Sequence, residues 1–301
     1  MRPRLLSVGI ATLDHVYAVE EMPTRAEKYR AYGFTTTTGG TAANAAIAMT
    51  RLGADATLLA RLGDDWAGAE IVDRLTREGV DCSRVRRVHG FPSPISAIVV
   101  DAIGERLVVS HADPAMPREI DWLPDALPDG TRAVLGDTRW QEATAHLFRL
   151  AREAGIPAVL DADRDPTHAP EVLSLATHVA FSMQGLRDIT GHADARTALE
   201  SYRPPVPCWI AVTNGGEGLF YWAGERVEHM PAFDVPVVDT LAAGDVWHGA
   251  FAVRLAEGAD EVAAARFASA AAAIKCTRFG GRDGAPMREA VEDFLRQRSV
   301  A

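Results

Sequence analysis

The chain has 301 residues, 31 basic and 41 acidic side chains, a formal net charge of −10, and 48% hydrophobic residues. This composition is typical of a folded globular protein and excludes a disordered one, and the acidic balance argues against partners held by bulk positive charge, such as nucleic acid or an anionic membrane. The three cysteines are too few and too widely spaced for a disulfide framework, and no apolar run is long enough to cross a bilayer, so we expect a cytoplasmic protein.

Apolar runs of strand length alternate with helical segments along most of the chain. We expect strands at 5–10, 56–61, 133–135, 158–160, 179–181, 209–213 and 235–238. We expect helices at 41–52, 66–78, 142–154 and 262–274, and a helix that starts just before residue 245. This alternation is typical of βαβ units, and it predicts an α/β fold with a mainly parallel central sheet and helices on both faces.

Two segments interrupt the alternation because they have β-branched, alternating character and no helix. Residues 14–37 and 91–113 are expected to form antiparallel ribbons that leave the main sheet and return. We interpret them as a small β lid over a cleft; the alternative is a pair of edge hairpins. The large domain then comprises 1–13, 38–90 and 114–301.

The strongest motif is Asp239-Thr-Leu-Ala-Ala-Gly-Asp245, which leads into an apolar helix. Its small residues let backbone N–H groups at the helix start approach an anion, which the helix dipole also favours. A carboxylate at Asp245 would lie where an acceptor hydroxyl meets a phosphoryl group, and it can act there as the general base. The alternative is structural: Asp239 or Thr240 caps the helix and Asp245 only complements its dipole.

A second motif, Gly39-Gly40-Thr-Ala-Ala-Asn44-Ala-Ala, lies about 200 residues upstream. Two glycines before a small-residue helix let a ligand approach the backbone, and Asn44 can both donate to and accept from a polyol. Tight helix–sheet packing would explain the alanines but not the asparagine.

A third motif, Val212-Thr-Asn-Gly-Gly-Glu-Gly218, lies between two strand-like runs. It predicts a glycine hairpin whose backbone could meet nucleotide phosphates, although a plain turn would have the same sequence. The candidate nucleotide-binding residues here are Thr213, Gly215, Gly216 and Gly218.

Together, the early Gly-Gly-x-x-x-Asn-x-Ala motif and the late Ala-Ala-Gly-Asp motif resemble the two signatures of the PfkB, or ribokinase-like, family of carbohydrate kinases. The resemblance implies a ribokinase-like fold with ATP across the large domain and a sugar under the lid. It also implies that Asp14 binds sugar hydroxyls and that Asp245 removes the proton of the acceptor hydroxyl. The backbone N–H groups that would stabilise the transferring phosphoryl group are those of Ala242, Ala243 and Gly244.

The chain departs from the family in the motif Asn-x-x-Glu, which commonly organises Mg²⁺ through water. Ser182 and Gly185 stand where the asparagine and glutamate would be. We therefore expect Mg²⁺ to arrive on the ATP phosphates, with help from Asp161 or Asp163 through water.

Several stretches are similar to the bacterial kinases that phosphorylate 6-deoxy-6-sulfofructose. They are residues 23–29, 136–140, 180–182, 266–269 and 275–284. In this resemblance Lys28 and Arg139 match anion-binding residues of those kinases. Ser110 stands where they carry an asparagine, so water or His111 would complete a sulfonate pocket.

Within the last of these stretches, Lys275 and Gly280 are assigned to the nucleotide side. Lys275 and Lys28 are the only lysines in a chain whose other basic residues are arginines.

We therefore expect an ATP-dependent kinase for the C1 hydroxyl of sulfofructose. Two alternatives stay open: a fructokinase-like or phosphoketose kinase, and a non-catalytic sugar- or nucleotide-binding regulator. The intact Ala-Ala-Gly-Asp245 argues against the regulator. Exposed edge strands in the lid would favour a homodimer.

Overall fold

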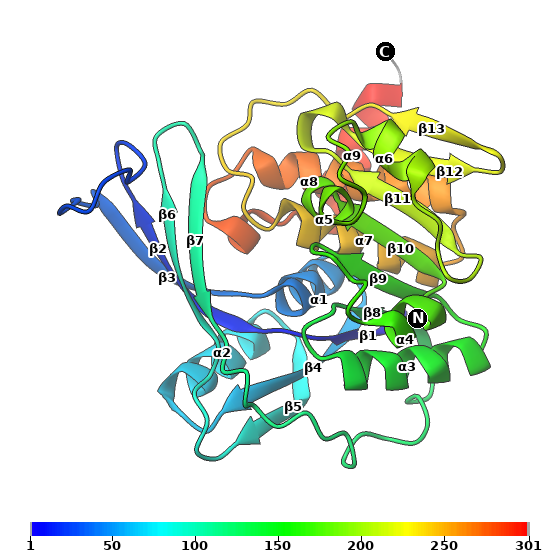
Figure 1. Cartoon of the computed structure of the whole chain (residues 1–301), viewed down its shortest axis with the longest axis horizontal. Helices are drawn as coiled ribbons and strands as arrows, with labels where there is room; N and C mark the ends of the chain where they lie inside the picture. Colours follow the sequence, from blue (N-terminus) through cyan, green and yellow to red (C-terminus); the bar gives the residue numbers. More distant parts are fainter. Residues whose placement is uncertain (1, 300–301) are drawn as a thin grey trace.

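The structure is a computed structural model that describes residues 2–299, and its strands form two separate sheets (Figure 1). The large sheet has the order β13-β12-β11-β10-β9-β8-β1-β4-β5. Its strands are β1 (Arg4–Val8), β4 (Asp55–Gly63), β5 (Asp81–Val88), β8 (Thr131–Gly136), β9 (Ala158–Ala162), β10 (His178–Ser182), β11 (Trp209–Thr213), β12 (Leu219–Ala223) and β13 (Arg226–Met230). All neighbouring strands are parallel except for the antiparallel β11–β12–β13 meander.

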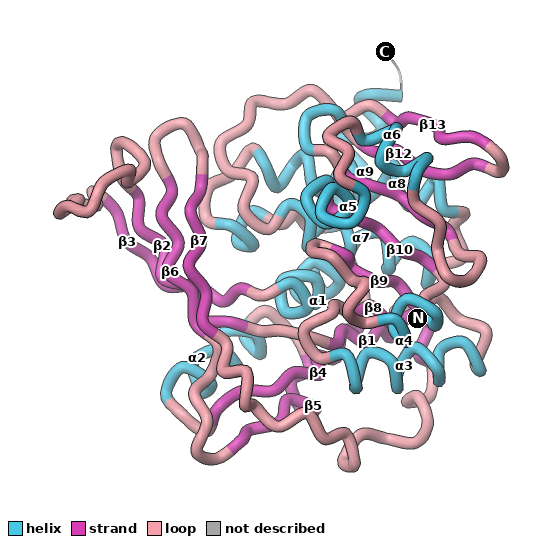
Figure 2. The backbone as a smooth tube through the Cα atoms, in the orientation of Figure 1, coloured by secondary structure: helices cyan, strands magenta, loops and turns pink. Residues whose placement is uncertain are grey.

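Helices cover both faces of this sheet, as the alternation predicts (Figure 2). One apolar layer includes α1 (Thr41–Arg51), α2 (Trp66–Arg77), α7 (Ala243–Ala256), α8 (Glu261–Cys276) and α9 (Arg288–Ser299). The opposite layer includes α3 (Gln141–Glu153), α4 (Pro170–Leu175), α5 (Met183–Thr190) and α6 (Ala195–Ser201). Two short 3₁₀ turns, η1 (Gly215–Glu217) and η2 (Gly281–Gly284), complete the elements. No helix within residues 2–299 combines the length and the apolar character needed to span a bilayer.

The small sheet is the expected lid. It contains β2 (Thr12–Ala18), β3 (Gly33–Gly39), β6 (Ile95–Val100) and β7 (Arg106–His111) in the order β3-β2-β6-β7, and it projects to one side of the large sheet (Figure 1). The two predicted ribbons join through the parallel pair β2–β6. One face of the lid packs on Leu241, which leads into α7, through Val16, Ile98 and Val100. Because side chains alternate along a strand, this inner face also carries Asp14, Ser96 and Ser110, which are cross-strand neighbours.

One sequence expectation about the strands was wrong, and one edge strand was not expected. Residues 235–238 are not a strand: the segment passes the end of α8, where the N–H groups of Val238 and Asp239 both donate to the Cys276 carbonyl. Val237 and Val238 are 64% and 49% exposed, so their apolar character does not mark burial in a sheet. Strand β5 was not predicted because three arginines interrupt its apolar pattern; it lies at the edge of the sheet, where such side chains reach solvent.

The approach of α1 to α7 depends on Gly249. A Cβ atom at this position would lie 2.7 Å from the carbonyl oxygen of Ala45 and 3.0 Å from the Cβ of Ala48. Only glycine therefore allows the two helices to pack at this separation. The first turns of α1 and α7 carry the two signature motifs, so this packing sets the width of the site between them.

We predict that Gly249→Ala lowers stability. Alanine is normally the better helix former by about 1 kcal/mol, but its methyl group would overlap the Ala45 backbone, and overpacking costs about 1–3 kcal/mol. Urea unfolding measures the difference. Gly216→Ala is the control because no heavy atom lies within 4 Å of its built Cβ. A more stable Gly249→Ala variant would contradict the close packing.

Candidate active site

The early and late motifs meet at one hydrogen bond. The side-chain amide of Asn44 donates to Oδ2 of Asp245 at 2.6 Å, across 201 residues of sequence. Asn44 is buried in the first turn of α1, and Asp245 is partly buried in the first turn of α7. The sequence prediction that Asp245 lies at a helix start is therefore confirmed, and the contact joins the predicted sugar residue to the predicted base.

The environment of Asp245 makes its carboxylate a stronger base than an exposed aspartate. Burial raises its pKa to about 7, the amide of Asn44 opposes this rise, and the charges of Asp163 and Asp14 add to it. A carboxylate with a pKa near the working pH is well matched to general-base catalysis.

The turn that leads into α7 is strained. Ala242 has φ 63°, and it is the one non-glycine residue among those described with a positive φ. A left-handed alanine costs roughly 1–2 kcal/mol, so the surrounding contacts must hold it. A Cβ built on the next glycine, Gly244, meets no heavy atom within 4 Å, which leaves open space beside the helix start. The Ala243 N–H donates to the Thr240 carbonyl at 3.2 Å, so in this structure it is engaged within the turn.

The lid reaches this same turn. Nη1 of Arg106, on the inner face of β7, donates to the Thr240 hydroxyl at 2.5 Å, and Leu241 packs on the apolar inner face of the lid. The lid and the turn that leads into α7 are therefore in direct contact, and the candidate site lies beside this contact.

Asp14 occupies the sugar side of the site. Its Oδ1 accepts a hydrogen bond from Thr12 at 2.7 Å, and burial raises its pKa. A Cβ on Gly39 would lie 1.8 Å from Oδ2 of Asp14, so the glycine is required for the carboxylate to lie against the backbone. Gly40 has φ 92°, which also favours glycine. The structure thus brings Asp14, Gly39, Gly40, Asn44 and Asp245 together.

The predicted sulfonate residues are not all brought together. Ser110 lies on the inner face of the lid, in register with Ser96 and Asp14. His111 follows it and lies on the opposite face, so the strand does not direct it toward Asp14. Lys28 is exposed on the loop between β2 and β3. This loop extends from the outer end of the lid, away from α7 (Figure 1).

Arg139 lies at the carboxyl end of β8 among acidic side chains. Its Nη2 donates to Oδ2 of Asp163 at 2.5 Å, and its backbone N–H donates to Asp137. Asp161 is buried beside them, and burial together with the charge of Asp163 holds its pKa well above the usual range. Its Oδ2 is 3.3 Å from Nδ1 of His248.

Sequence reasoning did not assign a role to Asp137. It is fully buried and accepts hydrogen bonds from the Ile10 N–H and the Thr41 hydroxyl, so it ties the end of β1 to the start of α1. A Cβ on Gly9 would lie 2.1 Å from its carboxylate. Its signal in the sequence was a carboxylate directly after a buried strand, where sites of parallel sheets form.

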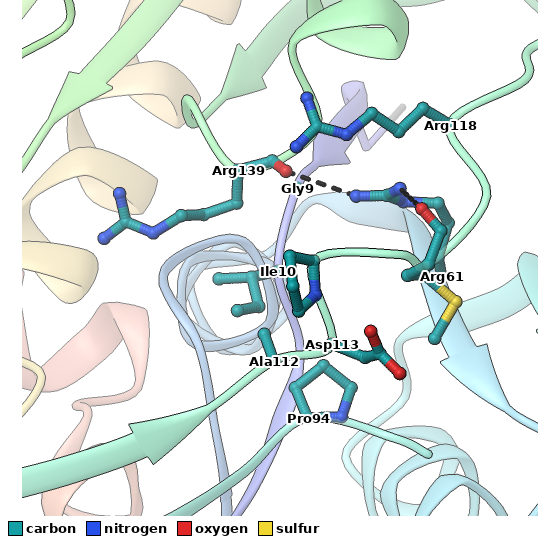
Figure 3. A pocket seen from close by; sticks show the side chains of 10 residues that line it. Gly9, Ile10, Arg61, Pro94, Ala112, Asp113, Arg118 and Arg139 are labelled. Atoms are coloured by element: carbon teal, nitrogen blue, oxygen red, sulfur yellow. Dashed lines mark hydrogen bonds between the residues drawn. The ribbon is translucent and has the colours of Figure 1, made fainter. Parts of the chain in front are cut away.

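A cavity of about 190 Å³ lies at the base of the lid beside Gly9 and Ile10 (Figure 3). Three arginines line it: Arg61, Arg118 and Arg139. Figure 3 shows the guanidinium of Arg61 at the Arg139 carbonyl, 3.2 Å away, whereas the side chain of Arg139 extends away from Arg61. Arg61 and Arg118 were not identified from the sequence because arginine is too common in this chain to stand out.

The predicted nucleotide residues fall into two groups. The β11–β12 hairpin is present as expected, and built Cβ atoms on Gly215 and Gly216 meet open space. Thr213 donates its hydroxyl to the Phe181 carbonyl, and Gly218 is required by the turn because a Cβ would lie 2.2 Å from the Met230 carbonyl oxygen.

The second group surrounds Asp239. Lys275 is fully buried and donates to the Asp239 carbonyl, and the Gly280 N–H donates to the Asp239 carboxylate. Both contacts lie within the protein, and the assignment of Lys275 and Gly280 to the nucleotide side stays a prediction.

The residues at the altered Mg²⁺ motif are structural. The Ser182 hydroxyl caps α5 by accepting from the Gly185 N–H, and it donates to the Asp163 carbonyl. A Cβ on Gly185 would lie 2.5 Å from the Ala162 carbonyl oxygen, so this packing excludes a glutamate. In residues 2–299 no group of three or more His, Cys, Asp or Glu side chains is arranged to hold a metal. Oδ1 of Asp163 is buried without a hydrogen-bond donor, so this carboxylate fits a water-mediated contact.

Comparison with known proteins identifies one family over nearly the whole chain. The model described as pfkB family carbohydrate kinase matches residues 2–288. The chain is 29% identical over 290 residues to a ribokinase of Bacillus subtilis, covering 96% of this chain and 98% of that protein. A deoxyribokinase of Salmonella typhi is 26% identical over 299 residues, covering 96% and 97% of the two chains.

Solved structures agree with this match. A protein from Agrobacterium tumefaciens, provisionally described as a ribokinase, superposes with a TM-score of 0.92 at 36% identity and 100% coverage of both chains. The ribokinase of Thermotoga maritima superposes with a TM-score of 0.77 at 25% identity, covering 98% of this chain and 100% of that one.

We predict that Asp245→Asn lowers turnover by about 10²–10⁴-fold, the usual contribution of a general base. The asparagine keeps the shape and can still accept from Asn44, but it cannot take the hydroxyl proton. In the wild type the carboxylate is protonated below its pKa of about 7, so kcat/KM should fall about tenfold per pH unit on the acid side. Steady-state kinetics from pH 5 to 9 measure both effects.

Asp234→Asn is the matched control, since Asp234 is an exposed aspartate on the segment that leads into α7. Turnover of Asp245→Asn within a few-fold of the wild type would show that another group is the base.

Proposed function

The chain belongs to the pfkB family of carbohydrate kinases, and from this membership we propose that it transfers the γ-phosphoryl group of ATP to the C1 hydroxyl of an anionic ketose. The specific acceptor proposed is 6-deoxy-6-sulfofructose. The observation that carries the choice of an anionic sugar is the arginine-lined cavity at the base of the lid.

The proposed reaction is a direct in-line transfer. Asp14 and Asn44 hold the sugar hydroxyls, and Asp245 takes the proton of the C1 hydroxyl as the oxygen attacks the γ-phosphorus. The bond from that phosphorus to the bridging oxygen of ADP breaks, and the N-terminus of α7 faces the charge on the transferring group. Mg²⁺ bound to the ATP phosphates would neutralise part of their charge, with Asp161 or Asp163 contacting it through water.

The cavity supports an anionic substituent on the sugar. A sulfonate is a permanent anion with three acceptor oxygens, and guanidinium groups are its natural donors. Arg118 has only a loose partner, Glu142 at 3.6 Å, so it has donors to offer. Ser110 lies on the lid face turned toward the site.

An uncharged pentose is the second candidate. It is favoured by the names of the relatives, a ribokinase and a deoxyribokinase, and by the exposure of Lys28 at the outer end of the lid. A kinase that acts on fructose, or on a phosphorylated ketose, would use the same residues around Asp245.

We predict that the wild type phosphorylates sulfofructose with a higher kcat/KM than fructose, ribose, fructose 6-phosphate or tagatose 6-phosphate. Arg118→Gln and Arg139→Ala should each raise the KM for sulfofructose by about 10- to 100-fold, because a hydrogen bond to a charged group contributes about 1.5–3 kcal/mol. The KM for fructose should change far less. Coupled ATP-consumption assays with each sugar measure these values.

Arg149→Gln is the matched control, since Arg149 is another arginine paired with one acid, Glu171, but lies on α3 outside the cavity. The sulfonate assignment is rejected if the wild type prefers ribose or fructose. It is also rejected if the variants lose activity equally on sulfofructose and on fructose.

We also propose that the protein is a homodimer through the lid. The outer face of the lid is apolar: Phe34 on β3 contacts Tyr17 on β2 with tilted rings, Val109 lies on the same face three strands from Phe34, and Phe34 and Val109 are 60% and 62% exposed. The edge strand β7 is exposed along its whole length. An apolar face beside an unpaired strand edge favours association with the lid sheet of a second copy of the chain.

Light scattering after size exclusion should give twice the 32.3 kDa chain mass at micromolar concentration. Phe34→Asp should give a monomer, because the charge would be buried in the interface. Val262→Asp, an exposed apolar residue on α8, is the control and should leave the mass unchanged. A monomeric wild type would exclude the dimer.

A further inference from the structure

Lys275 places a charged ammonium group in the interior, beside the catalytic turn. Its side chain is fully buried near the end of α8. Nζ donates to the carbonyl oxygen of Asp239 at 2.6 Å and lies 3.3 Å from Oδ2 of the same residue. Burial lowers the pKa of this ammonium, and Asp239 opposes the shift. A buried charge is retained only with a partner, and here one aspartate supplies both contacts.

Asp239 in turn fixes three backbone segments. Its Oδ1 accepts the Leu241 N–H at 2.8 Å, and its Oδ2 accepts the N–H groups of Gly280 and Gly281 at 3.1 and 2.8 Å. Its own N–H donates to the Cys276 carbonyl at 3.1 Å. Asp239 is therefore the junction between the end of α8, the η2 loop and the segment that enters α7.

The strained residue follows this junction directly. Ala242 comes three residues after Asp239 and one after Leu241, whose N–H the carboxylate holds. A left-handed conformation in a residue with a Cβ persists only where its surroundings fix it. The same turn sets the direction of the first turn of α7, which carries Asp245.

We propose that Lys275 is a positioning residue for phosphoryl transfer: its buried ammonium fixes Asp239 and so holds the left-handed turn at Ala242 that directs the start of α7 toward the acceptor hydroxyl. This inference rests on the proposed function, because it takes Asp245 as the base. Because Lys275 is fully buried and its ammonium is engaged by Asp239, the proposal assigns its contribution to kcat and not to substrate binding.

A neutral side chain cannot replace the ammonium. It would leave the Asp239 carboxylate buried without its counter-charge, and the carboxylate would then draw in water or move. An arginine keeps the charge, but its planar fork does not reproduce one short contact to a carbonyl in a space shaped for an ammonium. Both changes should therefore loosen the turn.

The test uses Lys275→Met, which keeps the length and removes the charge, and Lys275→Arg, which keeps the charge and changes its geometry. We expect kcat to fall about tenfold or more in both, with KM for sugar and ATP within about threefold of the wild type. Arg278→Met is the matched control, since Arg278 is exposed three residues further on, and it should leave both constants unchanged.

A second comparison tests whether Lys275 acts through the turn. Glycine adopts positive φ without strain, so Ala242→Gly should reduce the cost of losing Lys275. We expect the double variant Ala242→Gly/Lys275→Met to recover kcat at least about threefold over Lys275→Met alone, a coupling that independent sites would not show.

Hydrogen–deuterium exchange supplies a readout that does not depend on the sugar. The amides of Leu241, Gly280 and Gly281, which Asp239 holds, should exchange about tenfold faster in Lys275→Met, while those of β9 stay unchanged. Lys275→Arg serves the same measurement if the methionine variant does not fold.

Unchanged kcat and unchanged exchange at these amides would overturn the proposal. A raised KM with unchanged kcat would instead make Lys275 a ligand contact, and it would overturn the proposal as well. If the wild type phosphorylates no sugar, or if Asp245→Asn keeps its turnover, the proposed function fails separately, and the exchange measurement still decides the role of Lys275.

Discussion

The hydrogen bond between Asn44 and Asp245 is the contact on which the rest of the site depends. It brings Nδ2 of Asn44 within 2.6 Å of Oδ2 of Asp245, so the first turns of α1 and α7 must lie side by side. That distance explains the small residues on both helices, because Gly249 leaves no room for a Cβ against Ala45. The alanine-rich composition is therefore a geometric requirement of the site and not only a way to fill the core.

The same arrangement concentrates negative charge. Asp14, Asp161, Asp163 and Asp245 influence one another, and burial raises the pKa of Asp14, Asp161 and Asp245. A carboxylate whose pKa is raised by folding ionises more easily in the unfolded chain. The free energy of unfolding therefore falls as the pH rises from the unfolded pKa to the raised pKa of the folded protein. An ion pair limits this loss of stability, because Arg139 pairs with Asp163 among these carboxylates. Groups with pKa values shifted in this way by burial and neighbouring charge are concentrated at functional sites, which agrees with the predicted role of Asp245.

The sequence predicted those features that depend on local chemistry. Small residues before a helix predicted the site at Asp245, and alternating β-branched segments predicted the lid, because both patterns follow from backbone geometry. Features that depend on distant contacts were not predicted. The face of His111 follows from strand register, the burial of Lys275 follows from its partner Asp239, and the role of Asp137 follows from the approach of Thr41. Residues 235–238 were wrongly predicted to form a strand for the same reason, because this segment hydrogen-bonds to the end of α8 and not to another strand.

The contacts between the lid and the turn before α7 connect the predicted sugar-binding residue Asp14 to the predicted base Asp245. The lid carries Asp14 on β2, and the same inner face holds Leu241 and, through Arg106, the Thr240 hydroxyl. A lid that opens would therefore separate Asp14 from Asp245 and also release two residues of the turn that precedes α7. The Asp239 carboxylate accepts the Leu241 N–H of that turn, and this contact to the large domain does not involve the lid. The segment that enters α7 is thus held on one side by the buried Asp239 and contacted on the other by Arg106 and the apolar inner face of the lid.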